Sequence, residues 1–118
     1  MDINIFNDPN EIPQPRHKIK ITQLQVSPYP DRFRIYIELR VTAFQERPNL
    51  VLVVKRMDGL EVGELNIIET MHHKMEFTMH IRNVEDPAGE YEITAELFYE
   101  TRNPAQDRKH AIFQIPEA

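Results

Sequence analysis

Residues 87–99 read Pro87-Ala88-Gly89-Glu90-Tyr91-Glu92-Ile93-Thr94-Ala95-Glu96-Leu97-Phe98-Tyr99, a turn followed by strict alternation of apolar and polar side chains. Because successive side chains of a β-strand point to opposite faces, this pattern predicts a strand with one buried and one exposed face. The buried face would carry Tyr91, Ile93, Ala95, Leu97 and Tyr99. The stretch therefore indicates a β protein whose core lies on one side of a sheet.

Six further segments have the same strand character, and none of them shows the 3.6-residue period of a helix. They are residues 17–27, 32–43, 50–57, 60–67, 73–82 and 109–115. All nine prolines fall between or outside the alternating segments, as expected if those segments donate ladder hydrogen bonds that proline cannot make. The sequence therefore predicts an all-β domain of seven strands.

Local irregularities refine this picture. Leu24 and Val26 are out of phase by one residue with Ile19 and Ile21, which predicts a bulge. Residues 32–43 alternate most cleanly, and their inward side chains would be Phe33, Ile35, Ile37, Leu39, Val41 and Ala43. Residues 50–54 are apolar on both faces, which is typical of a central, covered strand. Asp58-Gly59 predicts a tight hairpin, since glycine supplies the positive φ that such turns require.

The number and order of these strands resemble an immunoglobulin-like or fibronectin type III-like sandwich. The motif Gly89-Glu90-Tyr91-Glu92-Ile93 resembles the tyrosine corner that enters the sixth strand of such folds. The resemblance implies a seven-stranded antiparallel Greek-key β-sandwich in which Tyr91 has a structural role. The chain has no cysteine pair and no tryptophan, and the acidic residue usually found at this corner is displaced to Asp86. The resemblance is therefore to a superfold, and a superfold implies no function.

The domain organisation follows from composition. Residues 1–16 have low apolar content, no period and three prolines, so they are expected to form an extended arm or linker before a sandwich domain at 17–118. Ile3, Ile5 and Phe6 would then dock on the body or on a partner. A length of 118 residues fits a single domain.

Composition also limits the compartment and the partners. The chain has no cysteine, which favours a reducing compartment and excludes disulfides and thiolate metal sites. The start Met1–Phe6 lacks the basic and apolar regions of a signal peptide, and no apolar run approaches the roughly 18 residues of a membrane span. We expect a soluble, cytoplasmic protein with no membrane insertion. A net charge of −5 argues against nucleic acid as the main partner.

The sequence offers little for catalysis. The one serine, Ser27, precedes Pro28 in a turn, and there is no cysteine nucleophile. The three glycines are far apart, so no phosphate-binding loop is expected. Glu92 and Glu96 would be about 14 Å apart on one strand, too far to act as a glycosidase pair. We therefore expect that the protein is not an enzyme.

His72, His73 and His80 lie among Met71, Met75 and Met79, a composition that suggests a copper or zinc site. His72 and His80 are eight residues apart, about 26 Å along a strand, which is too far for one ion. His72 and His73 would point to opposite faces. Core methionines with solvated histidines explain the pattern better, so we expect neither a metal nor another cofactor.

Charge segregation between the two presumed sheets carries the main functional hypothesis. The sheet containing the first, second and fifth strands is expected to be basic outside, with Lys18, Lys20, Arg32, Arg34, Arg40, Lys74 and Arg82 against Glu38 and Glu76. The other sheet is expected to be acidic with an apolar centre that includes Phe98 and Ile112. An apolar cluster rimmed by charge is typical of an interaction surface. The alternative is that the fourth strand or the N-terminal arm covers these residues within the monomer.

We therefore predict a non-catalytic module that binds another protein or itself through Phe98, Ile112, Glu96 and Glu100. A second hypothesis is a small-ligand or glycan-binding module at the loops 44–49 and 101–108. Its candidate residues are Arg47, Arg102, Asn103 and Arg108, with Asp107 beside them. A third, contact of the basic face with a membrane surface or nucleic acid, is opposed by the overall acidity.

Overall fold

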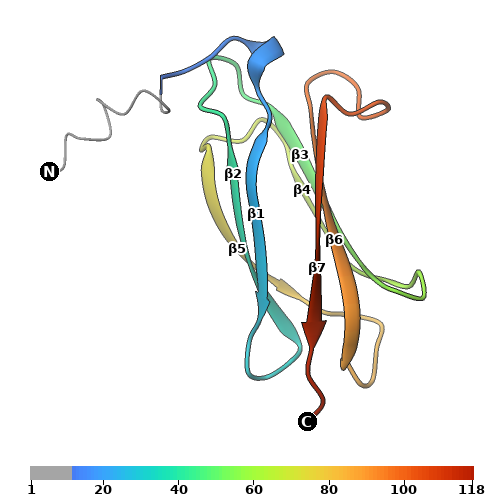
Figure 1. The fold of residues 1–118 in the computed structure, drawn as a ribbon. Helices are drawn as coiled ribbons and strands as arrows, with labels where there is room; N and C mark the ends of the chain where they lie inside the picture. The colour runs from blue at the N-terminus through green and yellow to red at the C-terminus, as the bar shows by residue number, and fades with distance from the viewer. Residues whose placement is uncertain (1–11) are drawn as a thin grey trace, which may run out of the picture.

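The computed structural model describes residues 12–118 and shows two antiparallel sheets packed face to face (Figure 1). One sheet has the order β1-β2-β5, formed by Ile21–Pro28, Arg34–Val41 and Lys74–His80. The other has the order β4-β3-β6-β7, formed by Glu61–Ile67, Asn49–Arg56, Gly89–Phe98 and Asp107–Ile115. The predicted seven-stranded antiparallel Greek-key sandwich of immunoglobulin-like type is confirmed.

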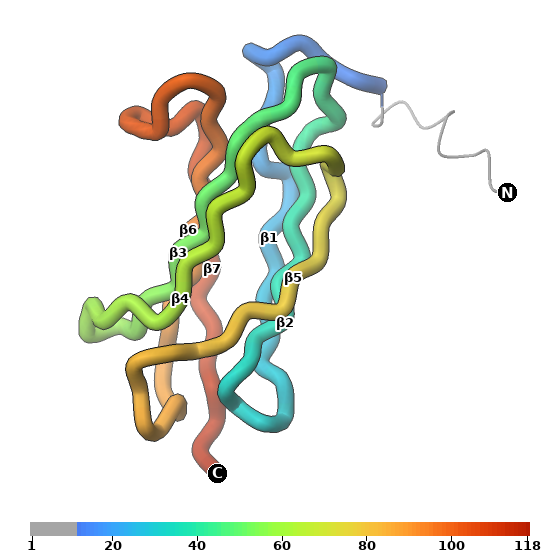
Figure 2. The backbone as a smooth tube through the Cα atoms, turned by 180° about the vertical axis from the view of Figure 1, so that it is seen from behind, coloured from blue at the N-terminus to red at the C-terminus, as the bar shows by residue number. Residues whose placement is uncertain are grey.

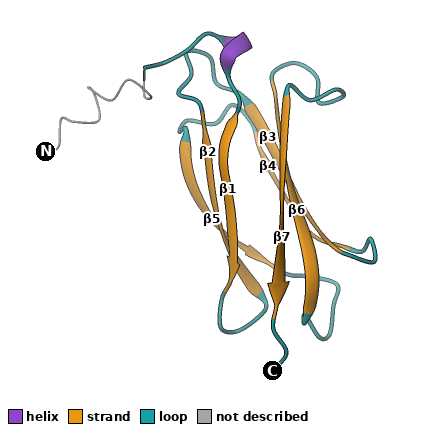
Figure 3. Cartoon of the chain, in the orientation of Figure 1, coloured by secondary structure: helices purple, strands orange, loops and turns teal. Residues whose placement is uncertain are grey.

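The chain passes between the sheets three times, after β2, β4 and β5, as the tube view shows (Figure 2). Apart from a 3₁₀ turn at Arg16–Lys18, the described residues consist of strands and loops (Figure 3). No helix in the described part is long and apolar enough to cross a membrane. As its two-sided apolar pattern predicts, β3 is a central strand, lying between β4 and β6.

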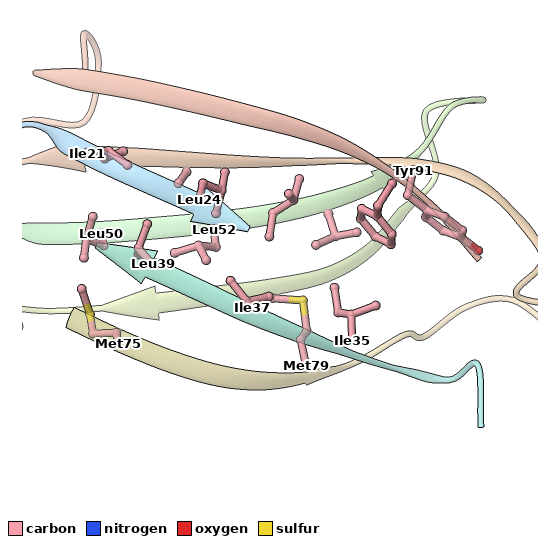
Figure 4. Close-up of a cluster of buried hydrophobic side chains, with 14 of the residues drawn as sticks. Ile21, Leu24, Ile35, Ile37, Leu39, Leu50, Leu52, Met75, Met79 and Tyr91 are labelled. Carbon is pink, nitrogen blue, oxygen red and sulfur yellow. The ribbon is translucent and has the colours of Figure 1, made fainter. Parts of the chain in front are cut away.

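The core lies between the inner faces of the two sheets. Ile37 and Leu39 of β2 are fully buried opposite Leu50 and Leu52 of β3 (Figure 4). Burial of each such aliphatic side chain contributes about 1.5–3 kcal/mol relative to its exposure to water. The alternating sequence thus stabilises the fold, because every second side chain of each strand is removed from water.

Tyr91 closes one end of this core. Its hydroxyl donates a 2.6 Å hydrogen bond to the carbonyl of Pro87, and its ring stacks on Phe113 with centroids 5.4 Å apart. Burial raises the pKa of Tyr91 above its ordinary value of 10. The geometry is that of a tyrosine corner, which ties the β5–β6 loop to the start of β6.

The bulge and the tight hairpin predicted from the sequence are both present, and the structure adds a second register shift. The β1–β2 register shifts between Ile21 and Gln23, and the β3–β4 register shifts between Val54 and Lys55. Gly59 has φ +97°, which allows the tight β3–β4 hairpin. Gly63 lies so close to Met79 that a Cβ at this position would be 2.5 Å from the methionine sulfur.

Two predicted core residues are placed differently. Phe33 is 40% exposed, because β2 begins only at Arg34 and Arg32 adopts φ +68° in the preceding turn. This left-handed residue breaks the alternation on which the inward placement of Phe33 depended. Tyr99 is half-buried rather than a core residue, and its hydroxyl donates to the carbonyl of Glu46 at 2.9 Å.

Only the end of the expected N-terminal arm at 1–16 can be placed. Residues 1–11, which include Ile3, Ile5 and Phe6, lie outside the described residues. Gln14 pairs in parallel with Phe44, accepting from the amide of Gln45 and donating to the carbonyl of Ala43, both at 2.9 Å. The Pro13 carbonyl also accepts from the side chain of Gln45, so the chain contacts the sandwich from Pro13 onward.

Candidate interaction surface

The outer face of the β4-β3-β6-β7 sheet, which points away from the other sheet, is the candidate surface, and we call it the outer face. Strand pairing arranges its side chains in rows, each running from β4 through β3 and β6 to β7. Three successive rows are Asn66–Val51–Glu96–Arg108, Glu64–Val53–Thr94–His110 and Glu61–Lys55–Glu92–Ile112.

A groove of about 300 Å³ crosses this face. Val53 and Thr94 form its floor, because the two central strands carry small side chains at this height. Val51 beside them is only 4% exposed. The long side chains of Glu61 and Glu64 on β4 and of Arg108 on β7 rise at the sides. The groove thus has a small, largely neutral floor between charged walls.

The outer face carries both signs of charge. Glu96 accepts from the Nε of Arg102 at 2.7 Å and lies 3.8 Å from the Nε of Arg108. Glu92 contacts the Nδ1 of His110 at 2.7 Å. The expectation of an acidic face is therefore wrong in part: the β4 side is acidic, and the β7 side carries basic groups.

The predicted interaction residues are distributed along this sheet. Ile112 is 57% exposed and lies beside Glu92, whereas Phe98 is half-buried and pairs with Asn49. Glu92 and Phe98 are six residues apart on β6, so Ile112 and Phe98 are about 20 Å apart and do not form one patch. Glu96 lies at the groove, and Glu100 lies beyond the end of β6.

Glu100 belongs to a polar cluster at the end of the sandwich. Its carboxylate is 3.4 Å from Arg16, whose guanidinium also contacts Glu46 at 2.6 Å and lies 4.5 Å above the ring of Tyr99. The hydrogen bond to Glu46 raises the pKa of Arg16, and burial raises the pKa of Tyr99. Arg47 lines a hollow beside this cluster.

The residues of the second hypothesis are consequently separated. Arg47 lies in the hollow with Arg16 and Tyr99, whereas Arg102 and Arg108 line the groove on the outer face. The backbone amide of Asn103 bonds to the Thr101 hydroxyl at 3.3 Å within the β6–β7 loop. The loops 44–49 and 101–108 therefore do not gather these side chains into one site.

Two projections frame the outer face, and the sequence analysis missed them. The β3–β4 hairpin and the β6–β7 loop both extend away from the other sheet (Figures 1 and 2). The hairpin tip exposes Met57, at 54%, and Leu60. The apolar residues flanking Asp58-Gly59 were the signal that could have revealed this tip, because exposed turns are usually polar.

The solvent-facing side of the β1-β2-β5 sheet carries less basic charge than the sequence predicts. Arg34 and Arg40 of β2 and Lys74 of β5 share it with Glu38 and Glu76. Arg32 leaves this face and reaches Asp86, 3.3 Å away, in the β5–β6 loop. Lys18 belongs to the terminal 3₁₀ turn, so the strands themselves carry three basic side chains against two acidic ones on this face.

Among residues 12–118, no group of three or more histidine, aspartate or glutamate side chains is placed to hold a metal ion. His73 directly precedes β5 and His80 is its last residue, so the two are about 23 Å apart along the strand direction. His72 lies in the loop before them. The histidine-rich segment is therefore spread along the sheet.

Comparison with known proteins gives the fold alone. No family model matches the chain, and no curated protein is similar to it in sequence. A Bifidobacterium dentium β-glucuronidase matches with a TM-score of 0.57 at 15% identity, over 82% of this chain and 18% of the enzyme. A putative β-galactosidase from Bacteroides fragilis gives 0.57 at 12% identity, over 82% and 17%. The chicken interferon gamma receptor alpha chain gives 0.56 at 6% identity, over 82% and 51%.

The chain thus spans less than a fifth of the two glycosidases and about half of the receptor chain. At these identities the likeness is one of architecture, and one sandwich architecture hosts many unrelated functions. Any function has to be argued from the surface of this chain.

Proposed function

We propose that the protein is a non-catalytic protein-interaction or assembly module that binds through the outer face of the β4-β3-β6-β7 sheet. The carrying observation is the exposure of Ile112. Among the described strands, it is the one large hydrophobic side chain that is exposed; the others with comparable exposure lie in loops. An exposed aliphatic side chain at the margin of a groove with charged walls matches the anatomy of a protein interface.

The surroundings of Ile112 support the same proposal. Met57 and Leu60 on the hairpin tip add apolar surface near the same end of the sheet. Ion pairs at the other side of the groove fix Glu96 between Arg102 and Arg108, so part of the polar rim is already ordered. A surface that is ordered before binding loses less conformational entropy when a partner arrives.

A glycan-binding module at the loops is the less favoured function. Sugar binding needs an accessible aromatic ring; of the rings beside these loops, two are engaged and the third, Phe98, is half-buried. Phe44 packs against the core, and Tyr99 lies under the Arg16 guanidinium. Arg47 and Arg102 also face different hollows.

Site-specific photo-cross-linking tests the proposal. A benzophenone side chain would replace Ile112 on the outer face or, as the matched control, Ser27 on the opposite sheet. Both positions are exposed and lie on strands. We expect discrete protein adducts from position 112, at native expression level or in concentrated purified protein, and none from position 27 in either sample. Equal yields from both positions, or none from position 112, would refute this use of the outer face.

A further inference from the structure

We propose that the partner of the outer face is a second copy of this chain, bound about a two-fold axis that runs parallel to the strands between β3 and β6. The inference rests on the proposed function and names the partner. It is carried by three independent properties of the outer face: its relief, its charge pattern and its exposed apolar residues.

The relief is self-complementary. The β3–β4 hairpin projects at the β4 side of one end, and the β6–β7 loop projects at the β7 side of the opposite end (Figures 1 and 2). A two-fold axis along the strands exchanges the two sides and keeps the ends. Each raised corner of one copy therefore meets a lower corner of the other. Twisted sheets stack in this nearly aligned manner in sandwich cores.

The charges are complementary under the same operation. Row by row, β3 of one copy faces β6 of the other, and β4 faces β7. Lys55 then lies opposite Glu92 of the second copy, and Glu92 opposite its Lys55, because the two residues share a row. Glu64 likewise faces His110 of the second copy. The alternative axis, perpendicular to the strands, would place the acidic β4 edges against each other.

The exposed apolar residues gain contacts in the same arrangement. Row by row, Ile112 lies opposite Glu61 of the second copy, at the base of its hairpin, and the hairpin tip with Met57 and Leu60 continues beyond that row at the same corner. At the other end, the β6–β7 loop faces the end of β4, where Ile68 is 80% exposed. An isologous interface repeats each of these contacts twice.

The size of the outer face limits the area that such a dimer can bury. Four strands about 4.8 Å apart and seven residues of about 3.3 Å give a projected area on the order of 500 Å² per copy. Two copies then bury about 1,000 Å², at the low end for specific interfaces. We therefore expect a weak, reversible dimer that is observed at high protein concentration and strengthened at low salt.

Charge reversal at one row tests both the face and the symmetry. Lys55→Glu and Glu92→Lys each create two like-charge contacts per homodimer, so each variant alone should dissociate at least about tenfold more readily. An equimolar mixture of the two variants restores both attractive contacts and should dimerise like the wild type. The double variant Lys55→Glu/Glu92→Lys should do the same. Arg40→Glu, a reversal on the opposite sheet, is the matched control and should leave association unchanged.

Sedimentation velocity from about 10 µM to 1 mM covers the weak affinity expected for this area, with circular dichroism confirming that each variant is folded. A monomeric wild type at the highest concentration would overturn the inference, as would a mixture that associates no better than its components. Photo-cross-links from position 112 to a different protein, with a monomeric wild type, would overturn the second-copy inference and leave the proposed function standing. A dimer insensitive to both reversals would also overturn it.

Discussion

Replacing Tyr91 with phenylalanine removes one buried oxygen from the end of the core and should be measurably destabilising. The Tyr91 hydroxyl is buried and donates its 2.6 Å hydrogen bond to Pro87, four residues earlier. Phenylalanine keeps the ring and its stacking on Phe113. The change therefore isolates the hydrogen bond that ties the β5–β6 loop to β6.

The expected loss of stability follows from the Pro87 carbonyl, which Tyr91→Phe leaves without its hydrogen-bond donor. Pro87 is itself buried, so its carbonyl would lose a partner without gaining free access to water. A buried polar group left unsatisfied costs about 1–3 kcal/mol. Since the packing of the ring is preserved, we expect Tyr91→Phe to lower the free energy of unfolding by about 1–2 kcal/mol. In a domain of this size that lowers the melting temperature by roughly 4 °C per kcal/mol.

Urea denaturation followed by circular dichroism measures this loss. The midpoint should fall while the slope with denaturant stays unchanged, because the folded and unfolded surfaces are nearly the same. Tyr99→Phe is the matched control: its hydroxyl also donates to a backbone carbonyl, that of Glu46, but at the exposed end of the sandwich. We expect a loss below about 0.5 kcal/mol there, since water can replace the bond. Equal losses for the two variants would refute the assignment of Tyr91 as the structural corner.

Three further outcomes follow from the described contacts. Gly63→Ala should destabilise the fold by about 1–3 kcal/mol, because the new methyl group would overlap the Met79 sulfur. Thermal melts should show a smaller loss of stability when Gly63→Ala is introduced into the Met79→Ala background than into the wild type. Gly59→Ala should cost about 1 kcal/mol in the same assay through its φ of +97° alone, since the space around it is open. Burial raises the pKa of Tyr91 in the folded state, so its contribution to stability is complete below its ordinary value of 10 and is lost as pH rises through the raised value. The gap in melting temperature between wild type and Tyr91→Phe should therefore narrow above pH 10, and a gap that widens would contradict this sign.

The sequence predicts the fold well because the decisive signals are local. Alternation along each strand states which side chains are buried, and short turns between strands favour antiparallel neighbours. The prediction fails for Phe33 because the left-handed backbone of Arg32 shifts the start of β2, and nothing in the local alternation records that turn.

The surface was less predictable because long-range contacts shape it. Arg102 and Arg108 were assigned to a loop site, but the structure aims both at Glu96. The β6–β7 loop that carries Arg102 is fixed by Gln106. Its backbone amide donates to the carbonyl of Leu97, and its side-chain amide donates to the carbonyl of Ile19 at 2.7 Å. The latter contact joins residues 87 positions apart, beyond the reach of any local pattern.

The lateral edges of the sandwich give a reason for binding to use a sheet face. On one side the amide of Arg82 donates to the carbonyl of Val62 at 2.9 Å, which links the loop after β5 to the edge of β4. On the other side the amide of Ile21 in β1 donates to the carboxylate of Asp107 at 2.7 Å, at the start of β7. A partner adding a strand at these points would have to break such bonds before forming its own. A partner lying on the outer face breaks none of them and covers Ile112, so the face is the less costly route to association.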